Sequence, residues 1–294
     1  MTISSRSQLH YEVHGSRGPH VLLVHGMLSS RAQWAPNLAA LTPFARPVVV
    51  ELLGHGRSPS PADPQLYSPE SYCREFERIR EALGAPRWFV VGQSLGAALT
   101  LRYALDHPRR VVAQVFTNSN SALAEPEWGP SLRPAMEALG AELAREGRGA
   151  LERMAIHPKH GRLPRELQAP LVADAALHTP RGVGLTALHT VTTSSVRAQI
   201  HANTVPSLLV VGEYESRFAA HREFAEKTMP QLRVVRLPAG HAVNLHCADA
   251  FNRAVVDFLA PHVPARSKAR LRTEASDAVA PRAPDGAQIG RERK

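Results

Sequence analysis

The sequence lacks the features of secreted, membrane-spanning and disulfide-rich proteins. Its two cysteines, Cys73 and Cys247, are too few for a disulfide scaffold or a cysteine-based metal site. No apolar run approaches the ~20 residues that a membrane-spanning helix needs. The first residues have no apolar segment behind their positive charge, so no secretory signal is expected. These absences predict a cytoplasmic protein with no membrane span.

Motifs for cofactors and metals are missing as well. There is no G-x-x-x-x-G-K loop for phosphates, and the glycine-rich run at 54–58 does not match the dinucleotide fingerprint G-x-G-x-x-G. No cluster of His, Cys, Asp and Glu has the spacing of a metal site. We therefore expect neither a cofactor nor a metal.

Positive charge is in excess, but its distribution argues against a nucleic-acid partner. The formal net charge is +9, and residues 261–294 contribute +4 of it through eight Lys or Arg and four Asp or Glu. The other arginines are scattered, with no stripe of basic and aromatic residues. Residues 261–294 have few apolar side chains and no periodicity, which predicts a disordered basic tail. The expected partner is a small-molecule substrate, and the sequence leaves the oligomeric state open.

Alternating strand and helix patterns predict an α/β fold. Continuous apolar runs are typical of strands buried on both faces, and they occur at 21–24, 47–51, 87–92, 111–116, 206–212 and 232–237. Helical patterns occur at 31–41, 70–83, 95–107, 218–229 and 248–259. The alternation predicts a mostly parallel central sheet with helices on both faces. Residues 8–14 alternate apolar and polar side chains, which predicts an edge strand.

One segment departs from this alternation. Residues 121–203 contain no convincing strand, and prolines separate short helical stretches such as 131–146 and 167–177. We interpret this segment as a helical cap inserted into a core that consists of residues 1–120 and 204–260. Its many apolar side chains predict that some of them line a pocket beneath the cap.

The run Gly92-Gln93-Ser94-Leu95-Gly96 stands between a predicted strand and a predicted helix. It matches the G-x-S-x-G nucleophile elbow, in which a sharp turn holds a serine in strained backbone geometry. Small residues at both ends of the run avoid collisions in that turn. Free N–H groups at the helix N-terminus can stabilise negative charge on a substrate. Ser94 is therefore the candidate nucleophile.

A serine hydroxyl needs a base to take its proton, and the base needs an acid to orient it. His241 is the candidate base because it follows the last predicted strand, and sites in such sheets lie at the carboxyl ends of the strands. No aspartate lies between Gly212 and His241, so the acid is Glu215 or, as the alternative, Glu213. Glu215 is favoured because it lies three residues past Gly212, where the chain would turn away from the strand.

The negative oxygen of an ester intermediate needs two hydrogen-bond donors. The candidates are the backbone N–H groups of Leu95, next to the nucleophile, and of Met27, which follows His25-Gly26. Met27, Ser94, Glu215 and His241 all come just after predicted strands. We therefore expect them to meet at one edge of the sheet.

The chain resembles the α/β-hydrolase-fold serine hydrolases over about residues 8–260. The resemblance rests on the elbow and on His25-Gly26-Met27, Leu53-Gly54-His55-Gly56-Arg57-Ser58, Val211-Gly212-Glu213-Tyr214-Glu215 and Gly240-His241, in the family's order of nucleophile, acid and histidine. It implies Ser94 as nucleophile, His241 as base and Glu215 as acid. It also implies Met27 and Leu95 as oxyanion donors. Glu215 departs from the family, whose members usually have aspartate there.

The resemblance implies a reaction class. Serine at position 94 argues against haloalkane dehalogenases and epoxide hydrolases, which have aspartate there. We expect a serine hydrolase that forms an acyl-enzyme from a small to medium carboxylic ester, lactone or thioester with an apolar acyl part. An acyltransferase with the same triad and a ligand-binding or receptor-like protein with slow turnover are the alternatives. The sequence does not name the substrate, because the cap decides it.

Overall fold

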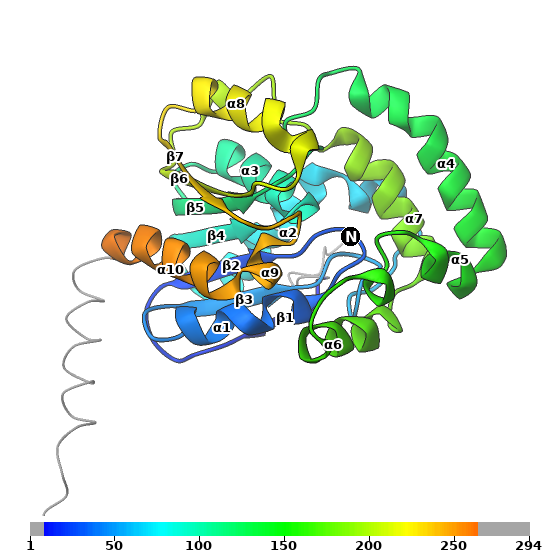
Figure 1. The fold of residues 1–294 in the computed structure, drawn as a ribbon, viewed down its shortest axis with the longest axis horizontal. Coiled ribbons are helices and arrows are strands. Elements are labelled where there is room, and N and C mark those ends of the chain that lie inside the picture. Colours follow the sequence, from blue (N-terminus) through cyan, green and yellow to red (C-terminus); the bar gives the residue numbers. More distant parts are fainter. Residues whose placement is uncertain (1–8, 264–294) are drawn as a thin grey trace, which may run out of the picture.

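A seven-stranded sheet forms the centre of the computed structural model, which describes residues 9–263 (Figure 1). Its strands lie in the order β1-β3-β2-β4-β5-β6-β7, and all neighbouring pairs are parallel except β1 with β3. The strands are β1 (Tyr11–Val13), β2 (His20–Val24), β3 (Arg46–Val50), β4 (Trp88–Gly92), β5 (Val111–Thr117), β6 (Ser207–Gly212) and β7 (Leu232–Leu237). The predicted mostly parallel sheet is confirmed, including the edge strand β1.

Helices cover both faces of this sheet, as predicted. One face packs against α2 and α3 and, further along the sheet, against α8. The other face packs against α1 and α10, with the short helix α9 beside them. These helices are α1 (Ala35–Leu41), α2 (Pro69–Ala82), α3 (Leu95–Asp106), α8 (Ala219–Thr228), α9 (Val243–His246) and α10 (Ala248–Leu259). Because successive side chains of a strand enter opposite cores, the inner strands are apolar at nearly every position.

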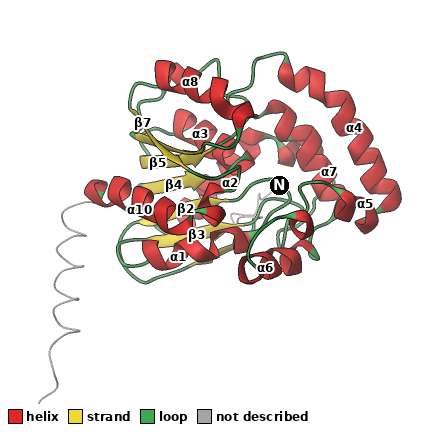
Figure 2. Cartoon of the chain, in the orientation of Figure 1, coloured by secondary structure: helices red, strands yellow, loops and turns green. Residues whose placement is uncertain are grey.

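The described chain between β5 and β6 contains helices and no strand. The helices are α4 (Trp128–Glu146), α5 (Arg148–Arg153), α6 (Arg165–Ala175) and α7 (Pro180–His189). Figure 1 shows them in green, gathered beside one end of the sheet, and Figure 2 shows the loops that join them. We call α4 to α7 the cap helices.

Close contacts attach the cap helices to the core. A Cβ atom on Gly182 of α7 would lie only 2.5 Å from the Cα atom of Gly54, so the two backbones approach directly. On α6, the Asp174 carboxylate accepts hydrogen bonds from Arg57 Nη2 and from Ser30 Oγ, both at 2.9 Å. The cap helices are thus held at two separate places on the core loops.

The structure differs from the sequence prediction at a few element bounds. The predicted helix 131–146 begins at Trp128, and Pro134 lies inside it. The sequence does not predict α7, because its two glycines disfavour a helix, and its packing on α4 and Gly54 supports it. Of the predicted disordered tail, residues 264–294 lie outside the described residues. Within residues 9–263, no helix is long and apolar enough to cross a membrane.

Candidate active site

Ser94 lies in a sharp turn between β4 and α3. Its φ of 53° and ψ of −116° put a non-glycine residue in a sparsely populated backbone region. Such strain persists only where the surrounding structure enforces it. Here Cβ atoms at Gly92 and Gly96 would lie 2.3 Å and 2.1 Å from the carbonyl oxygens of Gly96 and Val24. Larger residues could not be accommodated, so the elbow depends on both glycines.

His241 and Glu215 meet at the same edge of the sheet. The His241 Nδ1 atom lies 2.8 Å from Glu215 Oε2, so the ring donates its Nδ1 proton to the carboxylate and leaves Nε2 as an acceptor. The His241 side chain is 44% exposed and that of Glu215 is 15% exposed. The histidine is therefore open to a substrate, while the carboxylate is sheltered from water.

The structure separates the two possible acids. Glu213 is exposed, and its carboxylate has no hydrogen-bond partner within residues 9–263. Glu215 instead contacts His241. Ser94 and His241 both line the same cavities, although the described atoms contain no hydrogen bond between their side chains. Such contacts are often longer before a substrate binds.

Two asparagines that sequence reasoning did not assign a role hold the Glu215 carboxylate. Asn118 Nδ2 donates to Oε2 at 2.7 Å, and Asn120 Nδ2 donates to Oε1 at 3.1 Å. Burial raises the pKa of Glu215, but the hydrogen bonds from His241, Asn118 and Asn120 outweigh it and lower the pKa below its usual value. The sequence contained one sign of this role: both asparagines follow β5, which lies next to β6, the strand that precedes Glu215.

Two backbone N–H groups beside Ser94 are free to bind an oxyanion. Among the described residues, neither Met27 N nor Leu95 N has a protein acceptor. The loop that carries Met27 is fixed on both sides. Gly26 N donates to Gln33 Oε1 at 3.2 Å, and Leu28, with φ of 56°, donates its N–H to His55 Nε2 at 3.1 Å. The donors are therefore preorganised.

Three buried histidines support this loop. The rings of His25, His55 and His178 contact one another in sequence at tilted angles, with centroids 5.5 Å and 5.2 Å apart. Burial lowers their pKa values to about 3, 4 and 2. Being neutral, they can accept backbone N–H groups on unprotonated ring nitrogens, as His25 does from Leu52 at 3.0 Å. Their role is to position the loop.

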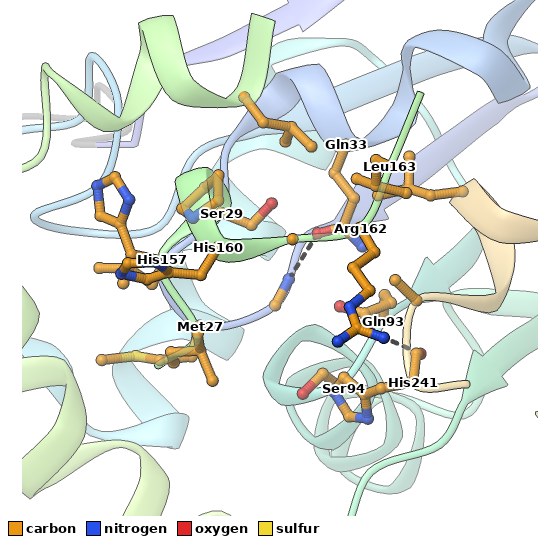
Figure 3. A pocket seen from close by; sticks show the side chains of 18 of the residues that line it. Met27, Ser29, Gln33, Gln93, Ser94, His157, His160, Arg162, Leu163 and His241 are labelled. Atoms are coloured by element: carbon orange, nitrogen blue, oxygen red, sulfur yellow. Dashed lines mark hydrogen bonds between the residues drawn. The ribbon is translucent and has the colours of Figure 1, made fainter. Parts of the chain in front are cut away.

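Two cavities meet at Ser94. The first, of about 310 Å³, is lined by apolar cap side chains, Trp128, Leu132, Met136, Leu139 and Met154 among them. The second, of about 360 Å³, is shown in Figure 3 and is lined in part by Gln33, His157, His160, Arg162 and Leu163. Met27, Ser94, Ile156 and His241 line both cavities. Among the described residues, no group of three or more His, Cys, Asp or Glu could hold a metal ion.

Comparison with known proteins adds a family context. The family model described as alpha/beta hydrolase fold matches residues 19–246. A Variovorax paradoxus protein provisionally named as a carbamate hydrolase, RutD, is 30% identical over 275 residues, covering 87% of this chain and 99% of that protein. A Bacillus subtilis protein provisionally named as a 2-succinyl-6-hydroxy-2,4-cyclohexadiene-1-carboxylate synthase is 25% identical over 248 residues, covering 81% and 89%. The solved enol-lactonase from Burkholderia xenovorans is 25% identical with a TM-score of 0.67, covering 86% and 96%.

Proposed function

Because the chain belongs to the alpha/beta hydrolase fold family and is a hydrolase, we propose that it cleaves carboxylic esters, lactones or thioesters through a Ser94-His241-Glu215 triad. The observation that carries this proposal is the 2.8 Å contact between His241 Nδ1 and Glu215 beside a strained Ser94. Glu213 is not part of the proposed triad.

The reaction begins when Ser94 Oγ attacks the substrate carbonyl carbon and His241 Nε2 takes its proton. Glu215 stabilises the imidazolium that forms. The N–H groups of Met27 and Leu95 stabilise the negative oxygen of the tetrahedral intermediate. His241 then protonates the leaving group, which departs and leaves an acyl-enzyme. Water, deprotonated by His241, releases the acid and restores Ser94.

The first cavity supports an apolar acyl part for the substrate. Its volume of about 310 Å³ suits a short to medium hydrocarbon chain, and the cap supplies nearly all of its apolar wall. An acyl group seated there keeps its carbonyl within reach of both Ser94 and Leu95, which line the same cavity. We therefore place the acyl part of the substrate in the first cavity.

The test compares the hydrolysis of p-nitrophenyl esters of increasing acyl length by the wild type and by Ser94→Ala. We expect the substitution to reduce kcat by about 10⁴–10⁶. We also expect a fluorophosphonate to label Ser94 in the wild type alone. Equal activity of the two proteins would show that Ser94 is not the nucleophile. Inertness toward oxygen esters, thioesters and the fluorophosphonate together would overturn the proposal.

A carbamate is the second candidate substrate, supported by the 30% identity to the protein provisionally named as a carbamate hydrolase. The same nucleophile can attack a carbamate carbonyl. A p-nitrophenyl N-alkylcarbamate distinguishes the two possibilities. Steady release of p-nitrophenol supports carbamate turnover, whereas a single burst equal to the enzyme concentration shows that the carbamoyl-enzyme is not hydrolysed.

A further inference from the structure

The two cavities at Ser94 differ in chemistry. The first is walled by hydrocarbon and sulfur side chains of the cap helices. The second also has apolar lining residues, such as Leu163 and Leu171, but it adds basic and polar side chains, including Gln33, His157, His160 and Arg162. None of its lining residues is an aspartate or glutamate. A substrate that crosses Ser94 would therefore have one end among apolar side chains and the other end within reach of Arg162 and polar groups.

Arg162 is the fixed positive charge of the second cavity. It lies in the loop between the 3₁₀ turn Pro158–His160 and α6, and Figure 3 shows its side chain extending from that loop into the cavity. Arginine remains protonated at any working pH. Within residues 9–263, its guanidinium pairs with no carboxylate. By contrast, Arg57 on the core binds both Asp174 and Glu51.

The neighbouring His157 adds a hydrogen-bond donor. The Nδ1 atom of His157 accepts the Lys159 N–H at 3.2 Å, so the proton of its neutral ring is on Nε2. Burial, followed by the charge of Lys159, lowers the pKa of His157. His160 has its Nε2 atom 2.9 Å from the Glu152 carbonyl oxygen. The guanidinium of Arg162 is thus available to a ligand, in the same cavity as the Nε2 donor of His157.

We propose that the second cavity binds a carboxylate on the alcohol or thiol side of the substrate, with Arg162 as its partner. The proposal rests on the proposed function and names its substrate class: an ester or thioester with an apolar acyl part and an anionic leaving group. The planar guanidinium matches a carboxylate through two parallel hydrogen bonds. The absence of acidic lining residues removes the repulsion that such a group would otherwise meet.

The test uses two substrates that differ at one group: 4-(butanoyloxy)benzoate, which carries a carboxylate, and its neutral methyl ester. Both present the same acyl part, and both release a phenol that chromatography quantifies. We expect Arg162→Gln to raise KM for the benzoate by about tenfold with little change in kcat, because one exposed charge-assisted contact is lost. The rise in KM for the methyl ester should be at least several times smaller. Arg162→Lys should retain part of the preference.

Arg165→Gln is the matched control. It removes the same charge three residues further along the chain, and Arg165 does not line the cavity. Equal effects of Arg162→Gln on the two substrates, or equal effects of the two variants, would overturn the proposal. If the wild type hydrolyses the methyl ester and Ser94→Ala does not, the proposed function stands whatever the two arginine variants show. If neither substrate is cleaved, calorimetry with 4-hydroxybenzoate tests the carboxylate site directly. Binding that is lost in Arg162→Gln supports the site, and any other result contradicts it.

Discussion

Glu215 receives three hydrogen bonds on its two carboxylate oxygens. His241 and Asn118 share Oε2, and Asn120 occupies Oε1. A glutamate has one more rotatable bond than the aspartate usual at this position in the family, so its carboxylate has more freedom to lose. The two amides restrict that freedom and keep the carboxylate ionised. A longer acid can thus orient His241 when neighbouring side chains hold it.

Substitution of the two glutamates after β6 tests this assignment. We expect Glu215→Gln to reduce kcat by about 10³–10⁴, because an amide cannot stabilise the imidazolium. Glu213→Gln should stay within about twofold of the wild type, since its carboxylate is exposed. Ester hydrolysis at saturating substrate measures both variants. A larger loss in Glu213→Gln than in Glu215→Gln would refute the assignment.

Asn120 gives a cleaner test of the clamp than Asn118. Asn118 also bonds the backbone of Gly212 through both N–H and carbonyl, so its loss would disturb the pairing of β5 with β6. Asn120→Ala should lower kcat by about tenfold with KM changed less, because one bond to a charged acceptor is removed. A thermal melt separates this effect from unfolding. An unchanged kcat in a stable variant would show that Asn120 does not position the acid.

Among the structural elements, the loop that carries Met27 depends on histidines that stay neutral. In the unfolded chain, His25, His55 and His178 protonate near 6.5, whereas burial lowers their pKa in the folded protein to about 3, 4 and 2. Between these values the unfolded state binds more protons than the folded state. Stability must therefore fall as the pH falls from 6.5 toward 4.

The expected loss over this window is up to about 3 kcal/mol for each histidine. Urea unfolding at a series of pH values measures it. His178→Asn should weaken the dependence of stability on pH, because it removes one of the three titrating rings. The Asn oxygen can still accept the Gly56 N–H that His178 Nδ1 accepts at 2.9 Å, so the contact is kept. Stability that is constant between pH 6.5 and pH 4 would contradict the prediction. Glu215 and Asp174, whose pKa values are lowered from 4.5 and 3.8, add to the loss of stability as the pH falls below about 4.5.

At the scale of the whole molecule, the closeness of α7 to the core determines how the cap helices enclose the first cavity. Gly182 meets Gly54 backbone to backbone, and Ala187 on the same helix lines the cavity. A side chain at 182 must move α7 outward. The packing of one helix on one loop therefore affects the space available to the acyl group.

We expect Gly182→Ala to destabilise the protein by about 1–3 kcal/mol and to raise KM for longer acyl chains. Gly140→Ala on α4 is the control, because a Cβ atom there meets nothing within 4 Å and alanine favours a helix. Urea midpoints and the acyl-length profile measure both variants. Equal stability of the two variants would show that the contact between Gly182 and Gly54 is not required.

Much of the fold and the candidate nucleophile could be predicted from local patterns. Apolar runs indicate strands buried on both faces, and G-x-S-x-G between strand and helix indicates the elbow, because these signals depend on neighbouring residues only. Because Met27, Ser94, Glu215 and His241 each follow a predicted strand, the sequence also predicts that they share the edge where parallel strands end.

Other features depended on residues far apart in the chain. Three such features join separate segments: the hydrogen bonds of Asn118 and Asn120 to Glu215, the tilted contact of the His178 ring with His55, and the cavity that Arg162 and Ser94 both line. α7 forms despite its two glycines because it packs on α4 and on Gly54. Only tertiary structure decides such pairs, since the distance between two side chains is set by how whole elements pack and by no local propensity. The sequence by itself therefore determined which reactive groups are available, and the packing of the cap helices on the core loops decided which side chains lie beside Ser94.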